Sequence, residues 1–311
     1  MDPRIHFTCP LEGDIILKKV LQWIDKNTKW IMTLPVIVFI LVMIAYPLFY
    51  TFRLSFHNWS LSSVTSMKWV GLKNYKDVLT DDRFIDSCWR TFLYAVVTLA
   101  FQTVAGLGLA LFINREFRLK GLTRTMFLLP LMATPVAVAM VWKLMYDYDL
   151  GAINYALDLL GLSKVAFLGE AKTALWALIL VDVWQHTPIV MLMCLGGLSS
   201  IPSDCLEAAA IDGANRRQIL TKITLPLLSP TILTAMMLRL IDLLKVFDHI
   251  YNMTHGGPGN SSTTINIIAY QQAFENFRFG KASATITIFF VILVIAMILF
   301  NYIRSKTVVD Y

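Results

Sequence analysis

Six long apolar segments divide this sequence, and shorter polar stretches separate them. Each segment reaches the roughly 20 residues that a helix needs to cross a bilayer. The segments cover residues 30–52, 89–113, 125–146, 174–198, 227–253 and 284–303. Because backbone polar groups in lipid must be bonded within the protein, the pattern predicts six transmembrane helices and an all-α membrane protein. With 57% hydrophobic residues and a mean hydropathy of +0.62, the chain has little sequence left for a soluble core.

Basic residues in the short connections predict the orientation of these six helices. Excess lysine and arginine marks cytoplasmic loops. These residues gather in four places: before the first segment, between the second and third segments, between the fourth and fifth segments, and in the tail. They are Lys18, Lys19, Lys26, Lys29, Arg115, Arg118, Lys120, Arg124, Arg216, Arg217, Lys222, Arg304 and Lys306. We therefore expect both termini, 114–124 and 199–226 on the cytoplasmic side, and 54–88, 147–173 and 254–283 outside. The net charge of +6 is then explained by the basic residues of the cytoplasmic loops. It does not indicate a basic surface for nucleic acid, and no nucleic-acid partner is expected.

The segment before the first span has its own pattern. Ile16, Val20, Trp23 and Ile24 recur at helical spacing beside lysines, which predicts an amphipathic helix on the cytoplasmic surface. The first apolar run is too long for a signal-peptide core, so we expect it to remain as an anchor. The predicted organisation is a surface segment at 1–29, a transmembrane domain at 30–306 and a tail at 307–311.

Two outer connections and four cysteines complete this outline. The connection at 147–172 predicts a short helix between turns, and 265–277 predicts a second one after the chain-breaking run at 254–259. The cysteines are Cys9, Cys88, Cys194 and Cys205, and their spacing shows no pairing. Neither a disulfide framework nor a metal site is expected, and no cofactor is implied.

The connection between the fourth and fifth segments is unusually rich in helix-forming and basic residues. Leu206, Ala209, Ala210 and Gly213 follow at i, i+3, i+4 and i+7, which predicts one small-residue face of a helix. Asp204 and Glu207 have the spacing of a capping box, and a turn is expected after Asp212. Such a face suits docking against another protein. The alternative is a helical hairpin on the lipid surface, held by Arg216, Arg217 and Lys222.

This connection also carries a motif. Glu207-Ala208-Ala209, then Gly213, then Ile223-x-Leu225-Pro226 resemble the EAA signature of binding-protein-dependent ABC importer permeases. Val70–Tyr75, Leu244–Asp248 and the run Thr254–Gly259 are similar to the sugar branch of that family, although His255 stands where members usually have glycine or a similar small residue. The resemblance implies the type I ABC importer permease fold, in the bacterial inner membrane. It also implies a cytoplasmic coupling helix that docks on a separate ATPase through Glu207, Ala208, Ala209, Asp212, Gly213, Ala214, Ile223, Leu225 and Pro226.

The same resemblance implies the partners and the solute class. It predicts a heterodimer with a second permease subunit, an ATPase dimer and an extracytoplasmic solute-binding protein. The solute is expected to be a sugar, polyol or related hydroxylated molecule. The alternative is an anionic solute, such as a sugar phosphate, glycerol phosphate or sulfonated sugar, to which Lys143, Lys245 and Arg239 are suited.

The residues themselves argue against hydrolytic chemistry in this chain. No GxxxxGK[ST] occurs, and no GxGxxG opens a helix after a strand, so we expect no nucleotide site and no enzyme activity. Gly106 and Gly108 lie within the second segment and predict close helix packing. A secondary transporter driven by an ion gradient is a rival interpretation, but it would have no use for an ATPase dock. A membrane-embedded enzyme would need a convergent nucleophile or metal set, and the sequence presents none.

Two polar groups within the apolar segments are candidates for the solute pathway. Charges inside a membrane normally face the protein interior or an aqueous cavity. The candidates are Arg239, Asp242, Lys245, Asp248 and Asn252 in the fifth segment, and Asp182, Trp184, Gln185 and His186 in the fourth. The alternating charges at three-residue spacing fit either a pathway lining or a structural ion-pair ladder. Pro130, Pro135 and Pro188 predict kinks in the third and fourth segments.

Overall fold

The structure is a computed structural model that describes residues 12–60 and 67–307 and divides into two units, 1–53 and 54–311. In the first unit, α1 (Glu12–Ile40), a π-helical turn (Leu41–Ala45) and α2 (Tyr46–Ser55) form one continuous helix. No break separates the predicted surface helix from the first span, because no helix breaker stands between Asp14 and Leu34. The expected boundary at residue 29 falls within this continuous helix, and both the boundary and the surface placement of the amphipathic part stay predictions.

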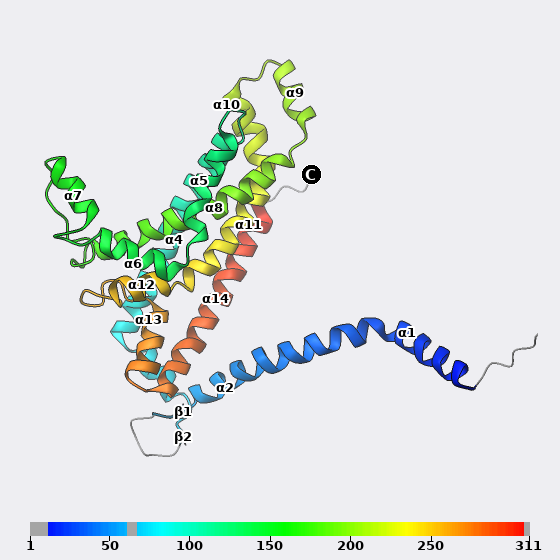
Figure 1. The fold of residues 1–311 in the computed structure, drawn as a ribbon. Coiled ribbons are helices and arrows are strands. Elements are labelled where there is room, and N and C mark those ends of the chain that lie inside the picture. The colour runs from blue at the N-terminus through cyan, green and yellow to red at the C-terminus, as the bar shows by residue number, and fades with distance from the viewer. Residues whose placement is uncertain (1–11, 61–66, 308–311) are drawn as a thin grey trace, which may run out of the picture. The chain divides into compact units, whose positions relative to one another are not determined.

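Four long helices form the bundle of the second unit (Figure 1). They are α4 (Asp82–Ile113), α8 (Ala174–Ser199), α11 (Leu225–Leu244) and α14 (Phe279–Thr307). α4 packs along α8, α11 contacts both of them, and α14 packs on α11. Within the described residues, five helices are long and apolar enough to span a membrane, and a bent pair makes a sixth candidate. The six predicted spans are confirmed on that count.

The third span is the bent pair, so the prediction of one helix over 125–146 is wrong in detail. α5 (Lys120–Met132) and α6 (Pro135–Met145) meet at 94°. The residue before a proline is restricted to extended conformations, and Thr134 is extended at φ −67° and ψ 143°. Pro135 then starts α6 in the first helical position, which proline favours. Pro130 and Pro188 lie inside α5 and α8, which continue through them.

The fifth span also breaks, which contradicts the single helix predicted over 227–253. α11 is preceded by α10 (Arg216–Ile219) and a π-helical turn (Leu220–Thr224), ends at Leu244, and is followed by α12 (Asp248–Thr254). No glycine or proline marks the break. Tertiary packing holds it, because Val246 is buried and Phe247 packs against the rings of Tyr251 and Tyr270. Broken helices are tolerated at membrane depth where they line a cavity.

Shorter elements connect the spans. A two-stranded antiparallel sheet, β1 (His57–Asn58) and β2 (Lys68–Trp69), precedes α3 (Lys73–Leu79). α7 (Ala152–Leu159) confirms the helix expected in 147–172. α13 (Ile265–Tyr270) with its π-helical turn (Gln271–Glu275) confirms the one expected in 265–277. His255 ends α12 in the left-handed region at φ 50°, which explains why glycine suits this position.

Close packing of α4 on α8 depends on one of the two glycines singled out in the sequence. A Cβ atom at Gly106 would lie 2.7 Å from the Cβ of Val190, so the predicted packing role is confirmed there. At Gly108 a Cβ would meet nothing within 4 Å, and the same prediction is wrong, because this face of the helix points away from α8. The small α9 (Ser203–Ile211) lies at the end of the bundle opposite α13 (Figure 1).

Candidate functional site

The helix α9, which carries the first part of the EAA-like motif, is largely exposed. Glu207 and Ala208 face solvent, and Ile211 is 86% exposed although it is a large apolar side chain. The predicted capping box at Asp204 and Glu207 is wrong. The helix already begins at Ser203 after Pro202, so Asp204 is its second residue and its carboxylate accepts from the Ser203 hydroxyl at 3.3 Å.

The turn after α9 is confirmed. Gly213 has φ +80°, a left-handed conformation that glycine adopts without steric cost. The amide of Ala214 donates to the carbonyl of Ala209 at 3.0 Å and closes the turn. A reciprocal capping box between Asn215 and Gln218, which the sequence analysis did not identify, then starts α10.

A cavity of about 250 Å³ lies beside this turn, and both parts of the motif contribute to it. Its lining consists of Asp212, Gly213, Ala214, Gln218, Lys222 and Ile223. Leu225 and Pro226 open α11 and are half-buried, so they belong to the packed base of the motif. The exposed carboxylates of Glu207 and Asp212 and the open turn at Gly213 form its accessible part. We call these exposed residues of α9 and its turn the α9 surface.

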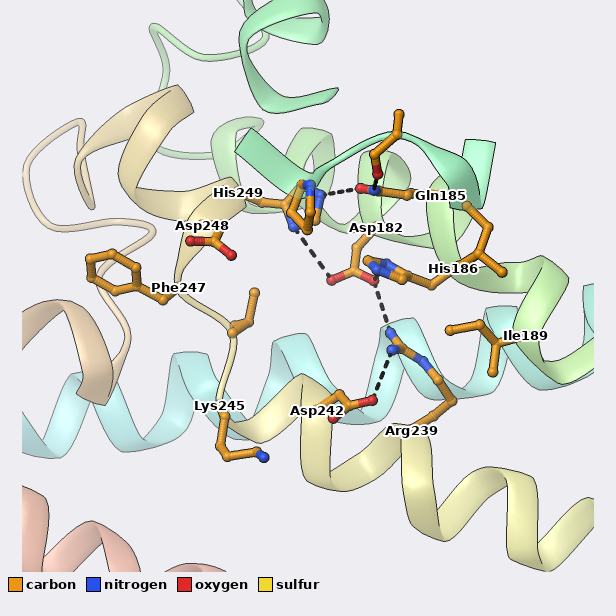
Figure 2. A pocket seen from close by; sticks show the side chains of 14 residues that line it. Asp182, Gln185, His186, Ile189, Arg239, Asp242, Lys245, Phe247, Asp248 and His249 are labelled. Atoms are coloured by element: carbon orange, nitrogen blue, oxygen red, sulfur yellow. Dashed lines mark hydrogen bonds and ion pairs between the residues drawn. The ribbon is translucent and has the colours of Figure 1, made fainter. Parts of the chain in front are cut away.

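A separate polar cavity of about 440 Å³ lies where both broken spans meet α8 (Figure 2). The α5–α6 junction supplies one wall, α8 another, and the α11–α12 break the third. The lining includes Ala133, Asp182, Gln185, His186, Ile189, Arg239, Asp242, Lys245, Phe247, Asp248 and His249. Seven of the nine predicted pathway residues are thus brought together, and we call this space the polar cavity.

The carboxylate of Asp182 is the centre of a buried network beside this cavity. Its side chain is 4% exposed, and the Tyr94 hydroxyl donates to its Oδ2 at 2.7 Å. Gln102 Nε2 donates to its Oδ1 at 3.0 Å, and His186 Nδ1 lies 2.8 Å from the same oxygen. These donors take the place of the solvent shell that burial removes from the carboxylate.

Arg239 supplies the opposite charge. Its Nη2 donates to Asp182 Oδ1 at 3.1 Å across the α8–α11 interface, and its Nε donates to Gln102 Oε1 at 3.0 Å. Its Nη1 reaches Asp242 Oδ2 at 3.3 Å, three residues along α11 (Figure 2). The guanidinium is only 4% exposed, so its donors are directed to protein groups. This is the structural ion pair anticipated for Arg239 and Asp242, with Asp182 as an additional and better-buried partner.

A second chain of polar contacts ties the two broken spans to α8. His249 Nε2 donates to Gln185 Oε1 at 2.7 Å, and Gln185 Nε2 donates to the carbonyl of Ala133 at 2.9 Å. Ala133 lies at the α5–α6 bend, and His249 follows the α11–α12 break. The bend leaves the Ala133 carbonyl without a partner in its own helix, and the Gln185 amide supplies the missing hydrogen bond.

The ion-pair ladder does not continue beyond Asp242. Lys245 and Asp248 both line the polar cavity and are exposed to it, but within the described residues they form no ion pair with each other. The helix ends between them, so the i,i+3 geometry that the ladder requires is lost. A hypothesis of paired charges at these two positions is therefore wrong.

Two of the predicted pathway residues lie outside the polar cavity. Trp184 points to the other face of α8, packs against Trp142 with ring centroids 5.4 Å apart, and lines an apolar cavity with it. Asn252 lies past the break, where its side-chain amide donates to the carbonyl of Asp248 at 2.8 Å. Successive residues of a helix are rotated by about 100°, so Trp184 lies on a different face of α8 from Asp182 and Gln185. Grouping the three by their closeness in the sequence overlooked this rotation.

Sequence reasoning missed three members of the network: Tyr94, Gln102 and His249. Gln102 offered a signal, because an amide in the middle of an apolar span is expensive unless a partner satisfies it. His249 stands beside the noted Asp248. Tyr94 carried no signal beyond its type, since tyrosine is common in membrane helices.

Comparison with known proteins places the chain among transport proteins. The family profile described as binding-protein-dependent transport system inner membrane component matches residues 102–309. The trehalose/maltose transport system permease protein of Thermococcus litoralis is 36% identical over 272 residues, covering 87% of this chain and 92% of the relative. The multiple sugar-binding transport system permease protein of Streptococcus mutans is 32% identical, covering 91% and 96%.

A solved structure has the same fold. The crystal structure of a bacterial ABC transporter involved in the import of the acidic polysaccharide alginate aligns with a TM-score of 0.82, over 93% of this chain and 99% of the matched chain. At 23% identity the likeness concerns the fold alone. The sulfoquinovosyl glycerol transport system permease protein of Agrobacterium fabrum is 31% identical, covering 92% and 94%.

Proposed function

Because this chain belongs to the family of binding-protein-dependent transport system inner membrane components, we propose that it imports a sugar or polyol as one half of a permease heterodimer. Its partners are a second permease, an ATPase dimer and an extracytoplasmic solute-binding protein. The two permeases rock between inward-open and outward-open states. The observation that carries the proposal is the exposed α9 surface with its EAA-like motif.

The α9 surface has the properties of a docking site for a soluble partner. Ile211 exposes an apolar side chain next to the carboxylate of Asp212, a mixture that protein interfaces cover. Glu207 is free to form a charge-assisted contact with a basic group of the ATPase. Gly213, at φ +80° with open space around it, lets the partner approach the backbone closely.

The energy source and the orientation follow from the same assignment. The sequence contains no Walker-type loop, so ATP is bound and hydrolysed by the partner subunit. The α9 surface then faces the cytoplasm, together with 114–124 and both termini, in agreement with the distribution of basic residues. The residues at 54–88, 147–173 and 254–283 face outward, toward the binding protein.

The polar cavity favours an uncharged hydroxylated solute over an anion. Arg239 and Asp182 neutralise each other inside the network, which leaves Lys245 as the exposed cation beside Asp242 and Asp248. One exposed ammonium against two carboxylates opposes an anion but offers donors and acceptors to hydroxyl groups. Lys143, the other candidate for an anion, donates to the backbone carbonyl of Asn252 at 3.3 Å.

Substitutions on the α9 surface test the coupling role. Gly213→Asp and Glu207→Lys should leave the subunit in the membrane at near-normal amount, since neither position lies in lipid, and should abolish uptake. The ATPase should detach or hydrolyse ATP without responding to the loaded binding protein. Gly213→Ala should be milder, because it adds a methyl group at a left-handed residue for about 1 kcal/mol and adds no charge.

The chain offers a matched control for each change. Gly161 also has a left-handed φ of +72° and open space around it, but it lies after α7, so Gly161→Asp repeats the backbone strain away from α9. Glu170→Lys repeats the charge reversal in the same outer connection. Both controls lie away from the α9 surface, so both should leave the ATPase attached to the permease, and full uptake with full ATPase coupling in Gly213→Asp would refute the coupling role.

A solute screen tests the second half of the proposal. Thermal-shift measurements on the partner binding protein with sugars, polyols and their phosphates should find an uncharged sugar or polyol as the stabilising ligand. Uptake by the assembled importer should follow the same preference. A binding protein that responds to sugar phosphates or sulfonated sugars alone would overturn the assignment of an uncharged solute and leave the coupling role intact.

A further inference from the structure

Another cavity, of about 490 Å³, lies where the end of α4, the start of α5 and the end of α8 meet. We call it the α5 cavity. It is distinct from the polar cavity and shares no lining residue with it. Since α8 ends at Ser199 and α9 begins at Ser203, the α5 cavity lies at the end of the bundle that carries the α9 surface.

The lining of the α5 cavity combines an apolar floor with a basic rim. Ile113, Leu192 and Leu195 supply the apolar part. Lys120 and Arg124, one turn apart on α5, supply the positive charges. This pairing of apolar surface with two cations in one cavity between transmembrane helices suits an amphiphile with an acidic head.

The charges of the rim are largely uncommitted. Lys120 contacts Glu116 at 2.7 Å, but Glu116 is 89% exposed, so this pair is in water and weak. Arg124 has no ion-pair partner in the part of the chain that the structure describes. The connection 114–124 holds four basic residues and one acidic residue, so the local field attracts anions.

We propose that the α5 cavity binds the phosphate headgroup of an anionic phospholipid, with Lys120 and Arg124 on the phosphate and the apolar floor against the glycerol and first acyl carbons. The cavity opens at the end of the transmembrane helices, where headgroups lie, and the proposed cytoplasmic orientation directs it to the leaflet with anionic lipid. This proposal rests on the proposed function only for the cytoplasmic orientation of the α5 cavity.

Two glycines leave room for the headgroup and provide a test that changes no charge. A Cβ atom at Gly121 or at Gly196 would meet nothing within 4 Å, so both positions border open space in the cavity. A leucine at Gly196 would fill that space while the helix keeps its packing. Gly197, its neighbour, is different, because a Cβ there would lie 2.6 Å from Leu228.

The test uses the assembled importer in detergent, where no charged bilayer surface contributes. Dioleoylphosphatidylglycerol and dioleoylphosphatidylcholine are titrated, and bound lipid is counted by native mass spectrometry. The phosphatidylglycerol should bind more tightly. Lys120→Gln and Arg124→Gln should each weaken it about tenfold, as expected for a hydrogen bond between charged groups. Gly196→Leu should abolish binding without loss of assembled protein.

Arg118→Gln is the matched control, because Arg118 is an exposed basic residue of the same connection that does not line the cavity. It should change the affinity by less than twofold. Equal binding of both lipids, an Arg118→Gln effect as large as that of Arg124→Gln, or unchanged binding in the Lys120→Gln/Arg124→Gln double variant would overturn the proposal. Binding of free inorganic phosphate that needs Arg124 while the lipid does not bind would identify a soluble anion instead. Uptake is not the readout, so failure here is distinguishable from failure of the transport assignment.

Discussion

Removing either member of the Asp182–Arg239 pair should destabilise the subunit far more than removing both. Asp182→Asn leaves the guanidinium of Arg239 buried at 4% exposure with Asp242 as its remaining charged partner, 3.3 Å away. Arg239→Gln leaves the Asp182 carboxylate buried without the guanidinium, beside Tyr94, Gln102 and His186. Breaking a buried pair by removing one partner costs about 3–5 kcal/mol. Because these remaining contacts soften the loss, we expect about 3 kcal/mol for each single variant.

The double variant Asp182→Asn/Arg239→Gln carries no uncompensated charge. The groups that bonded the two charged side chains remain beside the new amides: the Tyr94 hydroxyl contacted Asp182 and Gln102 contacted Arg239, so hydrogen-bond partners are still available. We expect a loss of about 1–2 kcal/mol, well below the sum of the single losses, because a buried ion pair contributes little net stability relative to a neutral replacement. The coupling energy between the two positions should therefore reach several kcal/mol.

Thermal unfolding of the purified subunit in detergent measures this coupling. For a chain of this size a loss of 1 kcal/mol lowers the midpoint by about 2–4 °C, so each single variant should unfold about 6–12 °C lower and the double variant about 2–8 °C lower. Asp242→Asn is the control, because Asp242 contacts the same guanidinium with a side chain that is 57% exposed. It should lose about 1 kcal/mol or less. A double variant that loses the sum of the single effects would show that the two charges do not interact.

Three further outcomes are expected. Lys245→Ala and Asp248→Ala should each lower uptake and the double change should not recover it, because the two residues form no ion pair; recovery at matched membrane amount would contradict this. Gly106→Ala should destabilise the subunit by about 1–3 kcal/mol through overpacking against Val190, whereas Gly108→Ala has open space and should be neutral or slightly stabilising in thermal unfolding. An impermeant thiol reagent applied to intact cells should label a single cysteine at Ser163 and leave one at Gln218 unlabelled; the reverse pattern would mean that the topology is inverted.

Much of this protein follows from the order of its residues. The apolar segments fixed the number of spans, because the length of a helix in lipid depends on consecutive residues. Pro135 indicated a kink in the third span, but the angle of 94° between α5 and α6 depends on the packing of the folded chain. The α9 motif, its turn at Gly213 and the exposed helix before it are local features, so the sequence alone was sufficient to locate them.

The tertiary structure decided which polar residues meet. Asp182 and Gln185 were visible as polar positions in an apolar span, but their partners Gln102 and His249 lie far away in the sequence. The α11–α12 break separates Lys245 from Asp248 with no glycine or proline to announce it, since ring packing around Phe247 stabilises it. Hydrophobic pattern specifies that a helix is buried in lipid, whereas the rotation of each helix against its neighbours depends on packing between distant segments. That rotation places Asp182 against Arg239 and turns Trp184 away.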